Sequence, residues 1–140
     1  MRKWKEFSYS YQWDAQGATV GYRPMITIVL SNGANSIRVN GLIDSGCDST
    51  MIESAIADEL AISGGASMQK IAVGGIAGSR KDAFKSDVTV KVAEFDRFLV
   101  SATFVPELPF ACLLGQRGFF DSFDVRFEKS KQKFYIRPLS

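Results

Sequence analysis

The sequence predicts an all-β barrel or sandwich with one or two short helices. Short runs of β-favouring residues recur along the chain and are separated by turn-forming residues. Apolar and polar residues alternate in several of these runs, as at Val88, Val90 and Val92. The chain has 140 residues, of which 46% are hydrophobic, which is enough for one domain with its own core.

The first half of the chain predicts two paired strands followed by a short helix. Residues 25–30 form a β-favouring run, residues 31–35 form a turn, and apolar residues then recur at even spacing up to Ile43. These two strands lead directly to Asp44. Apolar residues from 51 to 60 fall near helical spacing, with acidic residues on the other side, until residues 63–65 end the segment.

The second half predicts further strands and a closing hairpin. Residues 69–73 enter a glycine turn at 74–78, and residues 80–84 return beside them. Strands follow around Val88 and over 98–105, and Pro106 and Pro109 end the second of these. A buried strand over 110–115 leads into a helical turn over 116–123, and a lysine-rich turn joins the last two strands.

The composition excludes several classes of function. The formal net charge is +2, from 17 basic and 15 acidic residues that are scattered, so no nucleic-acid surface is expected. The absence of histidine removes Ser-His and Cys-His nucleophile pairs and histidine-bearing zinc sites. The two cysteines fit a reducing compartment. Residues 1–6 are basic, but residues 7–13 contain too many polar residues for a leader, so we expect a cytoplasmic protein without a membrane span.

The stretch over 41–50 is the most informative motif. It places Asp44 at the end of an apolar strand and follows it with Ser45 and Gly46. Such a strand directs the acid toward the interior, where burial disfavours the charged form of a carboxyl group. A small hydroxyl residue and a flexible glycine can hold the carboxyl oxygens without crowding a substrate. The pattern therefore predicts a catalytic acid at position 44.

The order of these motifs resembles the retroviral-type, single-domain aspartic peptidases, the retropepsins. The resemblance covers residues 23–127 and rests on the strand at 23–28, the motif at 42–46, the glycine turn at 74–78 and the hydrophobic-hydrophobic-Gly sequence at 113–115. It implies a closed acid-protease barrel that acts as a homodimer, with residues 23–140 as the protease domain. Residues 1–22 would be an extension that packs on this domain or on the dimer partner.

The resemblance also implies an activity. Two chains would each contribute Asp44 to one site, where one carboxyl keeps a proton and the other activates a water that attacks a peptide bond. The substrate would be a polypeptide in extended conformation, with apolar residues preferred around the cut. No cofactor and no metal is required. Asp121-Ser122-Phe123 lacks the glycine of a second motif, which agrees with the need for a dimer.

The resemblance assigns roles to individual positions. Asp44 would be the acid and base, Ser45 would brace the two loops, Gly46 would let the substrate backbone approach, and Asp48 would contact the substrate main chain or brace the loop. The substrate-closing flap would comprise Gly74, Gly75, Ile76, Ala77 and Gly78. Leu113 and Leu114 would line or support the substrate pockets.

Two departures from the family pattern concern the loop that contains Asp44. Serine stands at position 45 where threonine is commoner, and it still offers a hydroxyl. Gln116-Arg117 stands where the family often has an arginine or aspartate, so we expect Gln116 or Arg117 to replace the usual brace to Asp48.

Other interpretations of the same residues stay open. A retropepsin-fold module could bind extended peptides or mediate assembly without cleaving them. A hydrolase could use the Cys47 thiol or the Ser45 hydroxyl, although histidine is missing. Cys47 and Cys112 fit packed core positions more simply, and Asp48 could only cap the loop or the following helix. The aromatic residues between Trp4 and Trp13 predict a strand that packs on the barrel or on a partner chain.

Overall fold

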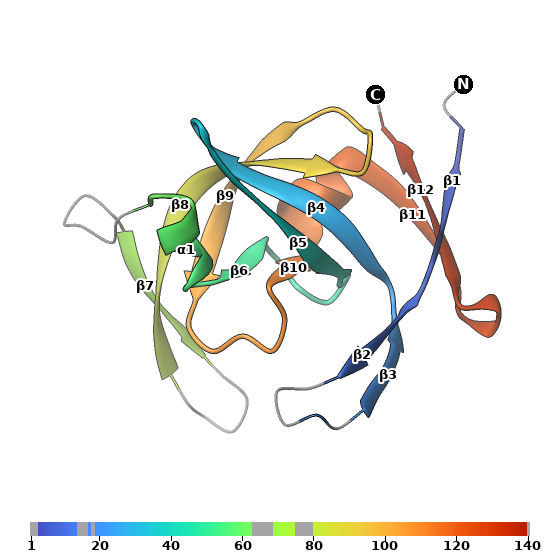
Figure 1. Ribbon diagram of the computed structural model, residues 1–140, viewed down its shortest axis with the longest axis horizontal. Helices are drawn as coiled ribbons and strands as arrows, with labels where there is room; N and C mark the ends of the chain where they lie inside the picture. Colours follow the sequence, from blue (N-terminus) through green and yellow to red (C-terminus); the bar gives the residue numbers. More distant parts are fainter. Residues whose placement is uncertain (1–2, 14–16, 18, 63–68, 75–79, 140) are drawn as a thin grey trace.

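The computed structural model describes residues 3–13, 17, 19–62, 69–74 and 80–139, and these residues form mainly β-strands (Figure 1). The strands, in chain order, are β1 (Lys5–Ser8), β2 (Ser10–Trp13), β3 (Thr19–Arg23), β4 (Met25–Asn32), β5 (Asn35–Ile43), β6 (Met51–Glu53), β7 (Gln69–Gly74), β8 (Arg80–Val92), β9 (Phe98–Val105), β10 (Cys112–Leu114), β11 (Phe123–Glu128) and β12 (Lys133–Pro138). The helical segments are α1 (Ile56–Glu59), η2 (Gln116–Phe120) and η3 (Lys129–Lys131).

A closed barrel forms the centre of the molecule. The strand order is β4-β5-β10-β6-β9-β8, and β4 also pairs with β8, which closes the ring; β7 extends the sheet beyond β8. Alternate residues of β4 point inward from residue 26 onward, so Ile26, Ile28 and Leu30 are buried while Thr27 is exposed. This arrangement confirms the all-β barrel that the sequence predicts.

Strand β10 positions the loop that contains Asp44. It lies between β5, to which it is parallel, and β6, to which it is antiparallel. The chain leaves the barrel after β5, forms the loop over residues 44–50 and re-enters at β6. The loop therefore begins and ends on the two strands that flank β10, which fixes both of its ends.

The structure corrects the helix expected over residues 51–60. Met51, Ile52 and Glu53 form β6 and pair with β9 and β10, and only Ile56–Glu59 is helical. Packing between two later strands overrides the helical spacing of the apolar residues. The strands around residues 80–84 and Val88 are one continuous strand, β8, and β10 is shorter than the predicted strand over 110–115.

The two ends of the chain meet in a second, smaller sheet. β1 pairs with β12, and β12 pairs with β11, in the order β1-β12-β11. Phe7 of β1 stacks on the buried Phe134 of β12 with ring centroids 5.3 Å apart. Phe7, one of the N-terminal aromatic residues, thus packs against the body of its own chain.

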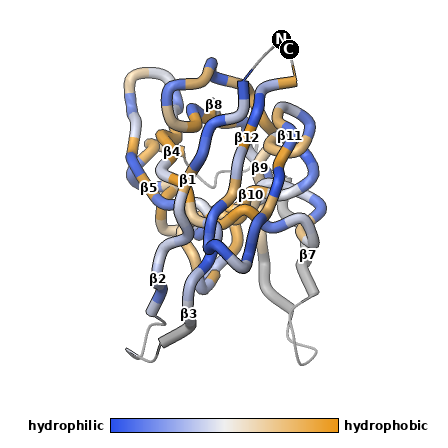
Figure 2. The backbone as a smooth tube through the Cα atoms, turned by 90° about the vertical axis from the view of Figure 1, so that its right-hand side faces the viewer, coloured by the Kyte–Doolittle hydropathy of each residue, from blue (hydrophilic) through white to orange (hydrophobic). Residues whose placement is uncertain are grey.

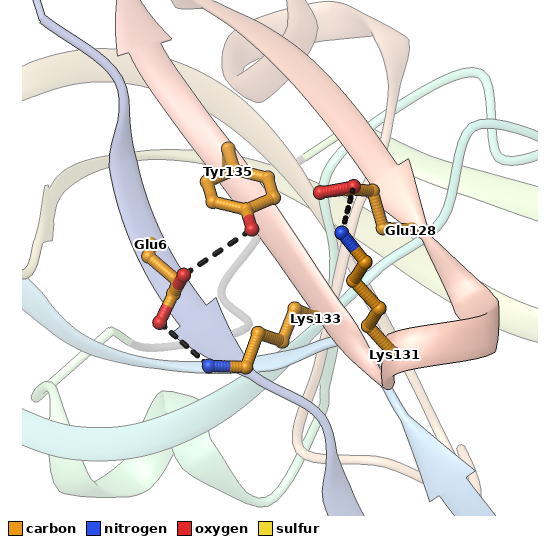
Figure 3. Close-up of polar contacts among 5 residues, drawn as sticks. All are labelled: Glu6, Glu128, Lys131, Lys133 and Tyr135. Atoms are coloured by element: carbon orange, nitrogen blue, oxygen red, sulfur yellow. Dashed lines mark hydrogen bonds and ion pairs between the residues drawn. The ribbon is translucent and has the colours of Figure 1, made fainter.

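The outer face of this small sheet is polar and its charges are paired. Glu6 accepts hydrogen bonds from Lys133 Nζ at 2.7 Å and from Tyr135 Oη at 3.2 Å, and Lys131 pairs with Glu128 at 3.6 Å (Figure 3). These contacts join β1 to the closing hairpin across the surface. These exposed contacts add to the main-chain pairing of β1 with β12.

A separate hairpin, β2 and β3, projects from the same end of the barrel as β7 (Figure 2). Its exposed rings pack against one another: Tyr11 lies 5.3 Å from Trp13 and 4.9 Å from Tyr22, between ring centroids. Within the single chain, the rings of Tyr11 and Trp13 contact one another and Tyr22, and the predicted packing on a partner chain stays a prediction. No described helix is long and apolar enough to cross a membrane.

Candidate active site

Asp44 is held where β5 ends. Its main-chain N–H donates to the carbonyl of Leu114 at 3.0 Å, which continues the parallel pairing of β5 with β10 by one residue. The preceding pair in the register is Ile43 with Leu114. Both residues are buried, so the strand that carries Asp44 is anchored in the core.

The Asp44 carboxyl caps its own turn. Its Oδ1 accepts a hydrogen bond from Gly46 N at 3.0 Å, and its main-chain carbonyl accepts one from Cys47 N at 3.1 Å. Within the described chain, Oδ2 receives no hydrogen bond from protein. One oxygen therefore fixes the orientation of the carboxyl group, and the other can meet water or substrate.

The structure places this carboxyl group at the surface of the single chain. Asp44 is half-buried, and Ser45, Gly46 and Asp48 are exposed. The sequence predicted a more interior position, but the turn after Ile43 directs the loop outward.

Gly115 lets the chain after β10 pass against the back of the loop. A Cβ atom built at this position would lie under 3.0 Å from the carbonyl oxygens of both Cys47 and Ser49, closer than real Cβ atoms come to backbone. No side chain fits there. The glycine of the hydrophobic-hydrophobic-Gly sequence therefore has a steric role, because it allows the loop and η2 to touch.

The next two residues bond to the loop. Gln116 N donates to Cys47 O at 2.8 Å, and Gln116 Nε2 donates to Ser45 O at 2.7 Å. Arg117 N donates to Asp48 O at 3.1 Å. Among the described residues, the side chains of Arg117 and Asp48 form no ion pair with each other, and these two residues are joined from main chain to main chain. Gln116 instead holds the main chain next to Asp44.

Thr50 anchors the far end of the loop, and sequence analysis missed it. Its side chain is fully buried, its Oγ1 donates to Arg117 O at 2.9 Å, and its carbonyl accepts from Thr103 N at 2.9 Å. Gly118 has φ of 99°, and a Cβ there would lie 2.9 Å from Thr50 Oγ1. A threonine at the end of a polar loop gives little signal of this role.

The two leucines of the signature differ in their surroundings. Leu114 is fully buried and contributes to the barrel core, whereas Leu113 is half-buried. Alternation along β10 explains the difference. Leu114 therefore supports the site from inside, and Leu113 is the one that still reaches the surface.

The predicted flap is described only at its base. Gly74 is the last residue of β7, which pairs with β8 in a hairpin from Gln69↔Lys85 to Gly74↔Arg80. The positions Gly75, Ile76, Ala77 and Gly78 lie outside the described residues.

Both cysteines are free thiols with packed side chains. Burial, reinforced by the charges of Asp44 and Asp48, raises the pKa of Cys47, and its Sγ donates to Ser49 O at 3.2 Å. Burial raises the pKa of Cys112 to about 12. Because the reactive form of cysteine is the thiolate, these shifts argue against a thiol hydrolase at this loop.

Comparison with known proteins identifies the fold. Residues 20–127 match the family model described as retroviral aspartyl protease. No curated protein sequence matches the chain. The crystal structure of a retropepsin-like aspartic protease from Rickettsia conorii matches 99% of this chain and 94% of that chain, with a TM-score of 0.66 and 12% identity. EIAV protease complexed with the inhibitor HBY-793 matches 67% of this chain and 82% of that chain, with a TM-score of 0.50 and 21% identity. These matches confirm the resemblance drawn from the motifs.

Proposed function

Because the chain belongs to the retroviral aspartyl protease family, we propose that it is an aspartic endopeptidase whose site forms when two chains bring their Asp44 carboxyl groups together. The position of Asp44 supports this proposal most directly. The carboxyl group is fixed through Oδ1, open at Oδ2 and only half-buried in the single chain. The exposed residues around it, Ser45 and Gly46, form a surface on which an identical loop can dock.

The chemistry would depend on the two carboxyl groups sharing a proton. Two acids held close cannot both ionise without a large cost, so one stays protonated. The ionised carboxyl takes a proton from a water molecule, whose oxygen attacks the carbon of the scissile carbonyl. The protonated carboxyl donates to the carbonyl oxygen as charge develops there. The carboxyl group that accepted the proton of water gives it to the leaving nitrogen as the C–N bond breaks. The other carboxyl group takes back a proton from a hydroxyl of the intermediate, so a carboxylic acid and an amine are released and both carboxyl groups return to their starting states.

The substrate would be a polypeptide in extended form. The β7–β8 hairpin is the element that would close over it, and main-chain hydrogen bonds would supply affinity. Leu113, half-buried beside the loop strand, would contribute to an apolar pocket. We therefore expect a preference for apolar residues around the cut.

The decisive experiment compares Asp44→Asn with Asp87→Asn. Asp87 is an exposed residue of β8, so its substitution controls for the loss of one carboxylate. We expect Asp44→Asn to lower the rate of cleavage of a denatured protein substrate by about 10²-fold or more, without lowering the Tm. Cleavage by the wild type should respond to a statine-type inhibitor, favour acidic pH, and rise more steeply than linearly with enzyme concentration.

Two results would contradict the proposal. The first is Asp44→Asn cleaving as fast as the wild type and Asp87→Asn. The second is a specific activity that stays constant on dilution while sedimentation shows only monomer, because a single chain holds one Asp44 motif.

A further inference from the structure

A groove of about 310 Å³ lies between β1 and the outer face of the barrel. Its walls come from β1, β4, β5 and the end of β8. Among its lining residues are Phe7, Met25, Val29, Arg38, Lys91 and Ala93. The half-buried Phe7 and Val29 give the groove apolar surface. Among the described residues that line it, two are basic and none is acidic.

The strand register places the two basic residues on either side of Val29. Val29 of β4 is opposite Arg38 of β5 and opposite Lys91 of β8. Directly opposed residues of antiparallel strands share one face of the sheet, so all three side chains lie on the outer face. Lys91 Nζ donates to Phe95 O at 3.0 Å. Arg38 is exposed and makes no side-chain hydrogen bond or ion pair in the described chain. The groove thus presents an unpaired guanidinium.

Unpaired strand edges border the same groove. β1 pairs with β12 on one side only, and Phe7 and Ser8 of β1 line the groove. β4 pairs with β8 from Ile28 onward, and Ala93 N, directly after β8, donates to Thr27 O at 3.5 Å, so among the described residues Met25 and Ile26 lie beyond this pairing. An extended peptide can add to such edges through main-chain hydrogen bonds. Its alternate side chains would then meet the apolar surface and the basic residues.

We propose that this groove binds an extended peptide segment that alternates apolar and acidic side chains. One lining residue, Met25, is opposite Leu42, which precedes Asp44 by two residues. A polypeptide bound there would be held near the site, which raises its effective concentration at the scissile position. This use as a substrate-recruiting surface rests on the proposed protease function, whereas the peptide binding does not.

Binding can be measured without cleavage on the full chain carrying Asp44→Asn. The probe is a fluorescent peptide that alternates valine with glutamate, and its anisotropy reports the complex. Matched peptides carry glutamine or lysine in place of glutamate. We expect the glutamate peptide to bind most tightly and to lose affinity as salt is added. Binding of the lysine peptide with equal affinity, or no binding of the glutamate peptide, would overturn the proposal.

Comparing Arg38→Glu with Arg97→Glu distinguishes peptide binding in the groove from a general effect of net charge. Both arginines are exposed, both variants change the net charge equally, and Arg97 does not line the groove. We expect Arg38→Glu to weaken binding of the glutamate peptide by about tenfold or more and Arg97→Glu by less than about twofold. Equal losses in the two variants would refute a groove site. So would a change of oligomeric state on Arg38→Glu with peptide affinity unchanged, because the groove would then bind a second copy.

Cleavage assays separate this inference from the proposed function. With Asp44 intact, a substrate that carries a valine-glutamate segment should have a lower KM than the same substrate with glutamine in place of glutamate. In Arg38→Glu, the two substrates should have equal KM values, and kcat should be unchanged. If no substrate is cleaved but peptide binding still depends on Arg38, the proposed protease function is refuted and the proposed peptide binding is supported. If cleavage occurs with equal KM for both substrates, substrate recruitment by the groove is refuted.

Discussion

The side-chain amide of Gln116 donates a 2.7 Å hydrogen bond to the main-chain carbonyl of Ser45, the residue that directly follows Asp44. The same residue bonds to Cys47 O through its main-chain N–H. Gln116 therefore holds the loop at two points, on either side of Gly46. The side-chain bond is exposed and joins residues 71 positions apart. It fixes the direction of the chain at the residue next to the acid.

Gln116→Ala should slow cleavage more than it destabilises the fold. The loss of one exposed hydrogen bond costs roughly 0.5–1.5 kcal/mol of stability, whereas a small displacement of Asp44 costs catalysis through lost alignment. We expect kcat to fall by about tenfold with a small change in Tm. Gln116→Arg restores a donor and should recover most of kcat, while Gln116→Glu places an acceptor against the carbonyl and should not. Equal kcat values for all three variants would show that the bond has no positioning role.

Gly115→Ala should destabilise the chain strongly. The added Cβ would overlap the carbonyl oxygens of Cys47 and Ser49, which are main-chain atoms that cannot rotate away. We expect the free energy of unfolding to drop by at least about 3 kcal/mol, the upper end of the overpacking range. Urea denaturation monitored by tryptophan fluorescence measures it. Leu113→Val, on the preceding strand and half-buried, is the control and should cost less than about 1.5 kcal/mol. A near-neutral Gly115→Ala would mean that the loop and η2 are not in close contact.

Local patterns in the sequence predicted most of the barrel. Alternating residues and turn signals identified β4, β5, β9 and the closing hairpin, because those features depend on neighbouring residues. β6 could not be found this way, since its residues also fit helical spacing and become a strand only between β9 and β10. The Asp44 motif is contiguous and could be read directly. The roles of Gln116 and Thr50 could not, because their hydrogen bonds span 71 and 67 positions of sequence.

Thr50→Val should remove a buried hydrogen bond without changing the shape of the side chain. The Thr50 hydroxyl donates to the carbonyl of Arg117, and the variant leaves that carbonyl without this donor. We expect a loss of about 1–3 kcal/mol in the free energy of unfolding. Thr27→Val is a matched control, because Thr27 is exposed and, among the described residues, its side chain bonds to Asn40 alone, so its loss should be within about 0.5 kcal/mol. Equal losses in the free energy of unfolding for the two variants would show that the buried Thr50 bond stabilises the fold no more than the exposed Thr27 bond does.

The Glu6–Lys133 pair should make stability depend on pH at both ends of the range. Hydrogen bonds from Lys133 and Tyr135 hold the pKa of Glu6 below its ordinary value of 4.5, and the bond to Glu6 holds the pKa of Lys133 above its ordinary value of 10.5. The Glu6 contribution is therefore complete above the ordinary glutamate pKa and is lost as pH falls through the lowered value. The Lys133 contribution is complete below the ordinary lysine pKa and is lost as pH rises through the raised value.

Glu6→Gln tests this dependence. The difference in unfolding free energy between wild type and Glu6→Gln, from urea denaturation, should be largest near neutral pH and shrink toward both extremes. Added salt should also reduce it, because the pair is exposed and screened. Glu59→Gln is the control for the loss of one negative charge, because Glu59 is exposed and belongs to α1, which is not part of this sheet. Its stability should follow the wild-type pH profile. A Glu6→Gln difference that stays constant from neutral to acid pH would show that the carboxylate of Glu6 contributes no charge-dependent stability to the contact between β1 and β12.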